Sequence, residues 1–225
     1  NYTMSSAGLE NLGLSEKNLA KINKLIKVPN GIILVAGATG SGKSTLVNLI
    51  VRFYDVTDGE ILIDGVNIKD YKLEYLYKLI GYVPQRAVLF NGTVNSNISY
   101  GEAMEKISDK KIVEASKVAQ ADEFISKMDD GYESHIAQGG TNISGGQKQR
   151  IAISRAIAKN PEIYIFDDSF SALDYKTDAV LRSELKKYTK DATSLIVAQR
   201  IGTIMNADKI IVLDNGESVG VGTHE

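Results

Sequence analysis

The feature that most constrains this chain is a strand, a glycine-rich loop and a helix that follow one another between residues 32 and 53. The continuous apolar run Ile32–Ala36 is typical of a short strand buried on both faces. The loop Gly37–Ser44 fits the pattern G-x-x-x-x-G-K-S/T. Apolar residues then recur at helical spacing, at Leu46, Val47, Ile50 and Phe53. This succession predicts an α/β fold with a loop suited to phosphate groups.

We call Gly37–Thr45 the phosphate-binding loop, because its residue types suit an anion. Glycines let backbone N–H groups turn toward phosphate oxygens without Cβ clashes, and the following helix presents its positive dipole end. Lys43 supplies a point charge for the β- and γ-phosphates, and the Ser44 hydroxyl is a hard ligand for Mg²⁺. The predicted phosphate-binding residues are Gly37, Ala38, Thr39, Gly40, Ser41, Gly42, Lys43, Ser44 and Thr45.

A carboxylate follows another apolar run. Ile163–Phe166 is typical of a buried strand, and Asp167 comes directly after it. In a chain with a phosphate-binding loop, a carboxylate at such a strand end holds Mg²⁺ through water. The sequence therefore predicts a site for a magnesium–nucleotide complex; the alternative is a glycine-rich turn that binds no ligand.

The remaining patterns alternate between strands and helices, which predicts a mostly parallel sheet covered by helices. Further strands are expected at Glu60–Ile63, Ile80–Val83, Ser194–Ala198 and Lys209–Leu213, and helices at 16–27, capped by Ser15, and at 73–79, 108–128 and 147–159. The helical stretch between Arg86 and Arg150 is too long for a crossover between strands, so we interpret it as an inserted subdomain. The predicted division is an N-terminal arm, helix and first strand at 1–36, an ATP-binding core at 37–85 and 160–225, and a helical subdomain at 86–159.

Composition excludes several classes of protein. The 26 basic and 28 acidic residues give a net charge of −2, so bulk electrostatics predict no nucleic-acid partner. The absence of cysteine excludes disulfides, thiolate zinc sites and cysteine nucleophiles. Uncharged apolar runs fall far short of the ~20 residues that cross a bilayer, and no signal peptide is recognisable. We expect a soluble, cytoplasmic chain.

From residue 46 to 225 the chain resembles the nucleotide-binding domain of an ABC transporter of the exporter type. The motifs stand in the family's order: Gln85 at a strand end, the segment Gln138–Gly140, the signature segment Ile143–Gln147, Asp167, and Ser171–Asp174. The resemblance implies a P-loop NTPase fold of the RecA-like kind, with ATP and Mg²⁺ as cofactors. It implies Ser44, Gln85 and Asp167 as the residues that address the metal.

The signature segment predicts a second chain at the site. Ser144 is a natural N-cap, and the two glycines after it expose the N–H groups of the following helix. The resemblance implies that this end binds the ATP γ-phosphate of a second ABC domain, in a head-to-tail sandwich. The residues concerned are Ser144, Gly145, Gly146 and Gln147. The alternative is an ordinary capped helix.

Two residues depart from the family's catalytic pattern. Asp168 stands where the family has a Glu that polarises the attacking water, and its carboxylate falls about 1.5 Å short. Gln199 stands where the family has a His, and an amide cannot carry a proton. With Gln85, these residues occupy the catalytic positions. We expect hydrolysis of ATP to ADP and phosphate to be weak, as in the degenerate half of a heterodimeric exporter. The only histidines, His135 and His224, are interpreted as surface residues.

The start of the chain departs from the family as well. No aromatic residue lies between Thr3 and Arg52, although the family stacks an aromatic on adenine from this region, and Tyr2 is too far upstream. Leu12–Thr45 instead resembles the approach to the phosphate loop in type II secretion and type IV pilus ATPases. We therefore hypothesise an engineered chimera with an incomplete antiparallel β-subdomain, against a natural ABC domain with a diverged start. Loss of the adenine stack weakens ATP binding by ~1–3 kcal/mol.

The alternatives differ in class. One is a nucleotide-binding and dimerisation module that does not hydrolyse ATP, and another is a designed test protein without a physiological role. In its natural setting the resemblance implies contact with the transmembrane domain of an exporter, at the inner face of the cell membrane. The transported substrate is not encoded in this part of the sequence.

Overall fold

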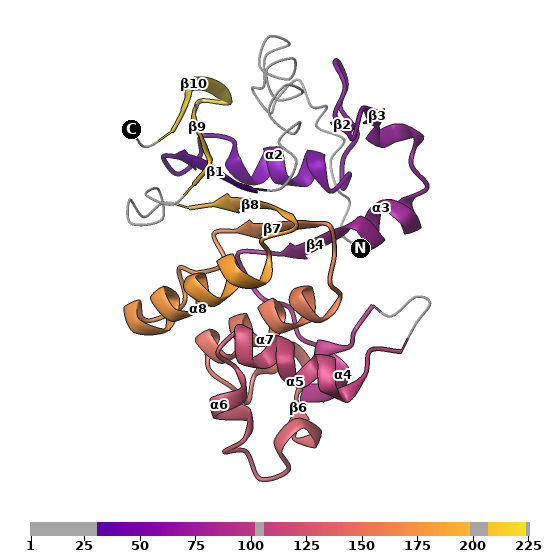
Figure 1. Cartoon of the computed structure of the whole chain (residues 1–225), viewed down its shortest axis with the longest axis vertical. Coiled ribbons are helices and arrows are strands. Elements are labelled where there is room, and N and C mark those ends of the chain that lie inside the picture. The colour runs from indigo at the N-terminus through magenta and orange to yellow at the C-terminus, as the bar shows by residue number, and fades with distance from the viewer. Residues whose placement is uncertain (1–30, 102–105, 199–206, 224–225) are drawn as a thin grey trace, which may run out of the picture. The chain divides into compact units, whose positions relative to one another are not determined.

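The computed structural model describes residues 31–101, 106–198 and 207–223 (Figure 1). These residues form two compact units, one from within 31–79 and 195–223 and the other from 80–194. Each unit combines strands with helices, and the pairings β1–β9 and β4–β7 are parallel, as predicted. The three-part domain division predicted from the sequence stays a prediction. The helix expected at 16–27 lies outside the described residues, and the expectation of an incomplete antiparallel subdomain stays a prediction.

The first unit is built on a sheet whose central strand leads into the phosphate-binding loop (Figure 1). Its strands are, in spatial order, β10 (Glu217–Gly222), β9 (Lys209–Asp214), β1 (Gly31–Gly37) and β8 (Thr193–Val197). Strand β10 runs antiparallel to β9 and is joined to it by a tight turn in which Asn215 and Gly216 have φ angles of 46° and 78°. The sequence reasoning missed β10.

Short elements complete this unit. They are α2 (Lys43–Ile50), β2 (Leu62–Ile63), β3 (Val66–Asn67), η2 (Ile68–Asp70) and α3 (Leu73–Leu79). Helix α3 has the predicted bounds. The strand predicted at 60–63 is reduced to its last two residues, which pair antiparallel with β3. Helix α2 packs on β1 through buried apolar residues such as Leu46.

Helix α2 ends three residues earlier than its apolar pattern suggests. Arg52 adopts a left-handed conformation with φ 56°, so that its N–H donates to Leu49 O at 3.1 Å and Phe53 N–H donates to Asn48 O at 2.9 Å. These two bonds are the 5→2 and 6→1 bonds that close a helix C-terminus. The prediction that Phe53 lies on the buried helix face is therefore wrong, and its side chain is 52% exposed.

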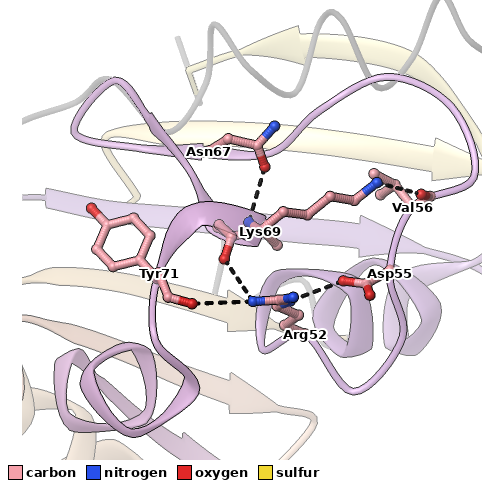
Figure 2. A network of polar contacts seen from close by, with 7 residues as sticks. Arg52, Asp55, Val56, Asn67, Lys69 and Tyr71 are labelled. Atoms are coloured by element: carbon pink, nitrogen blue, oxygen red, sulfur yellow. Dashed lines mark hydrogen bonds and ion pairs between the residues drawn. The ribbon is translucent and has the colours of Figure 1, made fainter.

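Arg52 is held in this strained conformation by its side chain (Figure 2). Its guanidinium donates to Asp55 Oδ1 at 2.9 Å and to the carbonyl oxygens of Ile68 and Tyr71 at 3.2 Å each. Lys69 donates to Val56 O at 2.9 Å beside it. Because the cation binds two backbone carbonyls far along the chain, the end of α2 is fixed to the segment that leads into α3.

The second unit carries the other sequence motifs. Parallel strands β4 (Ile80–Val83) and β7 (Ile163–Asp167) have the predicted positions and pair from Ile80–Ile163 to Val83–Phe166. The helices are α4 (Val94–Ile98), α5 (Asp109–Val118), α6 (Asp122–Ile125), α7 (Gly145–Ala158) and α8 (Tyr175–Tyr188). Two-residue strands β5 (Gly92–Thr93) and β6 (His135–Ile136) and the turns η3 (Gly131–Glu133) and η4 (Gln138–Gly140) connect them.

Helix α7 is the central helix of this unit. It packs against α4, α5 and β4 (Figure 1), and Ile151, Ile153 and Ile157 on it are fully buried. It begins two residues earlier than predicted, because Ser144 caps it. Helices α4 and α8 were not predicted, since their sequences carry few apolar residues at regular spacing. No helix among the residues that the structure describes is long and apolar enough to span a membrane.

A close contact in the second unit leaves no room for a side chain at Gly81 of β4. A Cβ atom at Gly81 would lie 2.6 Å from Pro161 Cγ and 3.3 Å from Ala156 O at the end of α7. We expect Gly81→Ala to lower the free energy of unfolding by about 1–3 kcal/mol through overpacking. Urea denaturation measures this, with Gly222→Ala as the control because nothing lies within 4 Å of a Cβ there. Equal stability of the two variants would contradict the packing described.

Candidate functional site

The phosphate-binding loop joins the end of β1 to the start of α2 in the first unit. Gly40 and Gly42 have φ angles of 83° and 94°, in the left-handed region that favours glycine. Gly42 is the N-cap of α2, which has no side-chain cap and no acidic residue in its first turn. The helix therefore presents backbone N–H groups and its positive dipole end without a protein carboxylate in that turn, which suits an anionic ligand.

The tight turn after β9 supports the loop from behind. Gly216 N–H donates to Ser41 O at 3.1 Å, and a Cβ at Gly42 would lie 3.2 Å from Gly216 Cα. At the other end of the loop, a Cβ at Gly37 would overlap with Leu213 O. Gly37 is thus required by close approach of the β9–β10 hairpin, and Gly42 is favoured by its left-handed φ together with a tight approach of Gly216. Sequence reasoning missed this support with β10, although the pair Asn215–Gly216 is a recognised hairpin signal.

The ammonium group of Lys43 lies against the loop. Its Nζ donates to Gly37 O at 2.7 Å, to Ala38 O at 2.6 Å and to Ser41 Oγ at 3.2 Å, and the residue is 7% exposed. The other side of the loop is open, because Ala38, Thr39, Gly40 and Ser44 are exposed. A buried, fixed positive charge beneath an exposed turn of backbone amides fits the polyphosphate chain of a nucleotide.

Two predicted residues meet at the strand ends of the second unit. Gln85, which follows β4, donates from Nε2 to Asp168 Oδ2 at 3.1 Å, and Asp168 has a left-handed φ of 46°. Asp167 ends β7 and is 5% exposed. Burial, with the Asp167 charge as the smaller cause, raises the pKa of Tyr82 to about 12. The structure thus places three of the predicted residues, Gln85, Asp167 and Asp168, at the ends of the paired strands β4 and β7.

The signature segment forms the start of α7, as predicted. Gln147 N–H donates to Ser144 Oγ at 3.3 Å, and Ser144 N–H donates to Gln147 Oε1 at 2.9 Å. This reciprocal pair is a capping box, which confirms Ser144 as the N-cap. Ser144 and Gly145 are exposed, so the helix terminus can be approached from outside.

The neighbouring motifs are ordered by local hydrogen bonds. Gly139 N–H donates to Leu89 O at 3.0 Å, and Asn91 N–H donates to Gln138 Oε1 at 3.2 Å. His135 is exposed and contacts Asn91 Oδ1 at 3.0 Å, as expected of a surface residue. Gln199, His224 and Tyr2 lie outside the described residues.

The combination of strand, phosphate-binding loop and helix with a mostly parallel α/β fold defines a P-loop NTPase, and comparison with solved structures agrees. A bacterial Atm1-family ABC exporter with ATP bound superposes with a TM-score of 0.83 at 39% identity, over 86% of this chain and 34% of that one. Residues 25–171 match the ABC transporter family profile. The chain belongs to the ABC transporter family, and corresponds to the ATP-binding domain of an exporter-type member.

Relatives of the chain are much longer than the chain itself. An uncharacterised ABC transporter ATP-binding protein of Mycobacterium tuberculosis is 50% identical over 198 residues, 88% of this chain and 34% of the relative. A putative multidrug export ATP-binding/permease protein of Staphylococcus aureus is 46% identical over 206 residues, 92% and 35% of the two chains. The ATP-dependent lipid A-core flippase of Haemophilus influenzae is 44% identical over 211 residues, 93% and 36%. The chain thus spans about a third of the length of these relatives.

The family match reaches further upstream than the sequence motifs suggested. It begins at residue 25, so the approach to β1 and the phosphate-binding loop are part of the ABC match. The resemblance of Leu12–Thr45 to secretion and pilus ATPases finds no support in the comparisons, and neither does the chimera. That resemblance rested on an amphipathic helix, a Pro-x-Gly turn and a strand before the loop, and such short local features do not separate one family of P-loop NTPases from another.

Asp174 gives a pH-dependent test of the segment Ser171–Asp174. Asp174 caps α8, and hydrogen bonds donated by the backbone N–H and hydroxyl of Thr177, at 3.0 and 2.7 Å, lower its pKa. A lowered folded-state pKa adds stability above the ordinary value of 3.8 and loses it as the pH falls further. We expect Asp174→Asn to be less stable than the natural chain at pH 7, with the difference shrinking below pH 3.8. Urea denaturation across this range measures it, and a constant difference would contradict the assigned cap.

Proposed function

We propose that this chain binds Mg·ATP and serves as the ATP-binding half of an export transporter with weak hydrolysis of its own. The observation that carries the proposal is the enclosure of the Lys43 ammonium by the phosphate-binding loop, at 2.6 and 2.7 Å from two of its carbonyl oxygens. In this proposal the loop binds the phosphates, and Ser44, Gln85 and Asp167 are the residues of the chain that address Mg²⁺. When bound there, Mg²⁺ would supply positive charge that offsets the negative charge developing during phosphoryl transfer.

Weak hydrolysis follows from two features of Asp168. Its side chain is one methylene shorter than the Glu of the family, so the carboxylate lies about 1.5 Å short of an attacking water. Its Oδ2 also accepts a hydrogen bond from Gln85 Nε2 at 3.1 Å, which directs the carboxylate toward β4. A base that is misplaced in this way forfeits about 10²–10⁴ in rate. Gln199 is the other departure from the family pattern: an amide stands where the family has a His, so no side chain at this position can carry a proton.

The partners in this proposal are a second ABC domain and a transmembrane domain. The exposed start of α7, where Ser144 and Gly145 stand, supports binding of ATP held by a second domain in a head-to-tail sandwich. Relatives named as multidrug export and lipid A-core flippase proteins support export across the cell membrane, with this domain at the cytoplasmic face. The transported substrate belongs to the part of such proteins that this chain does not contain.

Nucleotide binding is tested by Lys43→Ala. We expect saturable binding of Mg·ATP to the natural chain in equilibrium dialysis. Binding to the variant should be at least about a hundredfold weaker, because the ammonium group that would contact the β- and γ-phosphates is lost. Lys186→Ala is the control, since Lys186 is an exposed cation on α8. Absence of saturable binding to the natural chain would overturn the proposed function.

Turnover is tested by Asp168→Glu. If the reach of the carboxylate limits the reaction, phosphate release with Mg·ATP should rise by about 10²–10⁴. The double variant Lys43→Ala with Asp168→Glu provides the background rate. Release that stays at this background while ATP binds would favour the second candidate function, a binding and dimerisation module, which the Gln85–Asp168 hydrogen bond also favours.

A further inference from the structure

Helix α7 reaches the end of strand β4 through one buried amide. Gln149 is 2% exposed, and its Nε2 donates to Pro84 O at 3.1 Å. Pro84 directly precedes Gln85, and Gln149 lies only two residues beyond the signature segment. This hydrogen bond therefore joins the helix of the signature segment to the residue directly before Gln85, in addition to the bond that Lys159 at the end of α7 donates to Ile80 O at 2.8 Å.

The same strand end is bound from the β7 side. Ser169, which is fully buried, donates from Oγ to Val83 O at 2.7 Å, and Gln85 Nε2 donates to Asp168 Oδ2 at 3.1 Å. Two successive carbonyl groups, those of Val83 and Pro84, are thus bound by side chains from two different elements. The position of Gln85 depends on α7 and on the strand end of β7 together.

A second attachment fixes α7 to the residues that follow Gln85. Arg155 donates from Nε to Asn97 O at 2.7 Å and from a terminal nitrogen to Val88 O at 3.0 Å. Its guanidinium carbon lies 5.6 Å from the ring centre of Phe90 and 5.4 Å from that of Tyr100. Burial lowers the pKa of Arg155 to about 10, so it stays cationic at neutral pH. Arg155 therefore anchors the far part of this segment, and Gln149 anchors the part beside Gln85.

We infer that Gln149 is a positioning residue that makes the backbone at Gln85 follow helix α7. Nucleotide contact at the signature segment then changes the placement of Gln85 and Asp168, and nucleotide contact at Gln85 changes the signature segment. The coupling rests on the proposed function, but the attachment itself does not. Its physical basis is that the Pro84 carbonyl accepts a hydrogen bond from a buried side chain of α7. If α7 moves, the backbone at Pro84 must move with it or lose that hydrogen bond.

The attachment is tested by hydrogen exchange on the whole chain without nucleotide. Gln149→Met keeps the volume of the side chain and removes the donor. We expect exchange of the amides in 83–91 to rise about two- to tenfold, as for loss of one hydrogen bond. Ser154→Ala is the matched control: Ser154 is buried on the same helix, but its hydroxyl donates only within α7, to Arg150 O at 2.9 Å.

Gln149→Asn is a second variant that keeps an amide but is one methylene too short to reach Pro84 O, and it should give the same pattern. The inference is overturned if 83–91 exchanges as in the natural chain. It is equally overturned if Ser154→Ala raises exchange there as much as Gln149→Met does.

The coupling is tested by the same measurement with Mg·ATP. In the natural chain we expect slower exchange in both 83–91 and 143–149. In Gln149→Met we expect unchanged ATP affinity and slower exchange in 83–91, without the change in 143–149. Identical responses of both segments in the variant and the natural chain would overturn the coupling. Absence of saturable ATP binding to the natural chain would instead defeat the proposed function, and the measurement without nucleotide would still decide the role of Gln149.

Discussion

The position of the Lys43 ammonium is the constraint on which the first unit depends. A cation that is 7% exposed needs oxygen partners, and the carbonyl groups of Gly37 and Ala38 provide them only because the loop turns back on itself. This loop conformation requires glycines with left-handed φ angles and the hydrogen bond that Gly216 N–H donates to Ser41 O. The central strand, the hairpin at the sheet edge and helix α2 therefore all serve to hold one positive charge at the end of β1.

The second unit uses neutral groups for a comparable purpose. Ser169 and Gln149 bind the last carbonyl groups of β4 and its continuation, and both side chains are buried. Neither carries a charge, so the cost of burying them is small once they are paired. The result is a strand end whose exposed residue, Gln85, is placed by its backbone on one side and by Asp168 on the other. The chemistry proposed for this chain depends on the precision of that placement.

Much of this arrangement could be predicted from the sequence. Strands such as β4 and β7 were found with nearly correct bounds, because an apolar run that ends in Pro84 or Asp167 has few other interpretations. The cap at Ser144 was found because its chemistry is local. Strand β10 was missed since it mixes exposed valines with glycines. The early end of α2 was missed because arginine, unlike glycine or asparagine, is not a residue type that indicates a left-handed backbone.

The contacts that couple the motifs could not be predicted. Gln149 and Pro84 are 65 residues apart, and Gln85 and Asp168 are 83 apart, so only the fold brings them together. The resemblance of the start of the chain to secretion and pilus ATPases finds no support, for a different reason. A short helix, a Pro-x-Gly turn and a strand before a phosphate-binding loop identify the fold and leave the family undecided.

The left-handed backbone at Asp168 has a consequence for how such a site can change over evolutionary time. Among non-glycine residues, aspartate and asparagine adopt this region most readily, whereas glutamate gains no comparable ease there. An exchange of glutamate for aspartate therefore relieves backbone strain in the same step that it shortens the reach of the carboxylate. The backbone at this position therefore favours aspartate over glutamate in the free energy of folding, whatever either residue does for turnover.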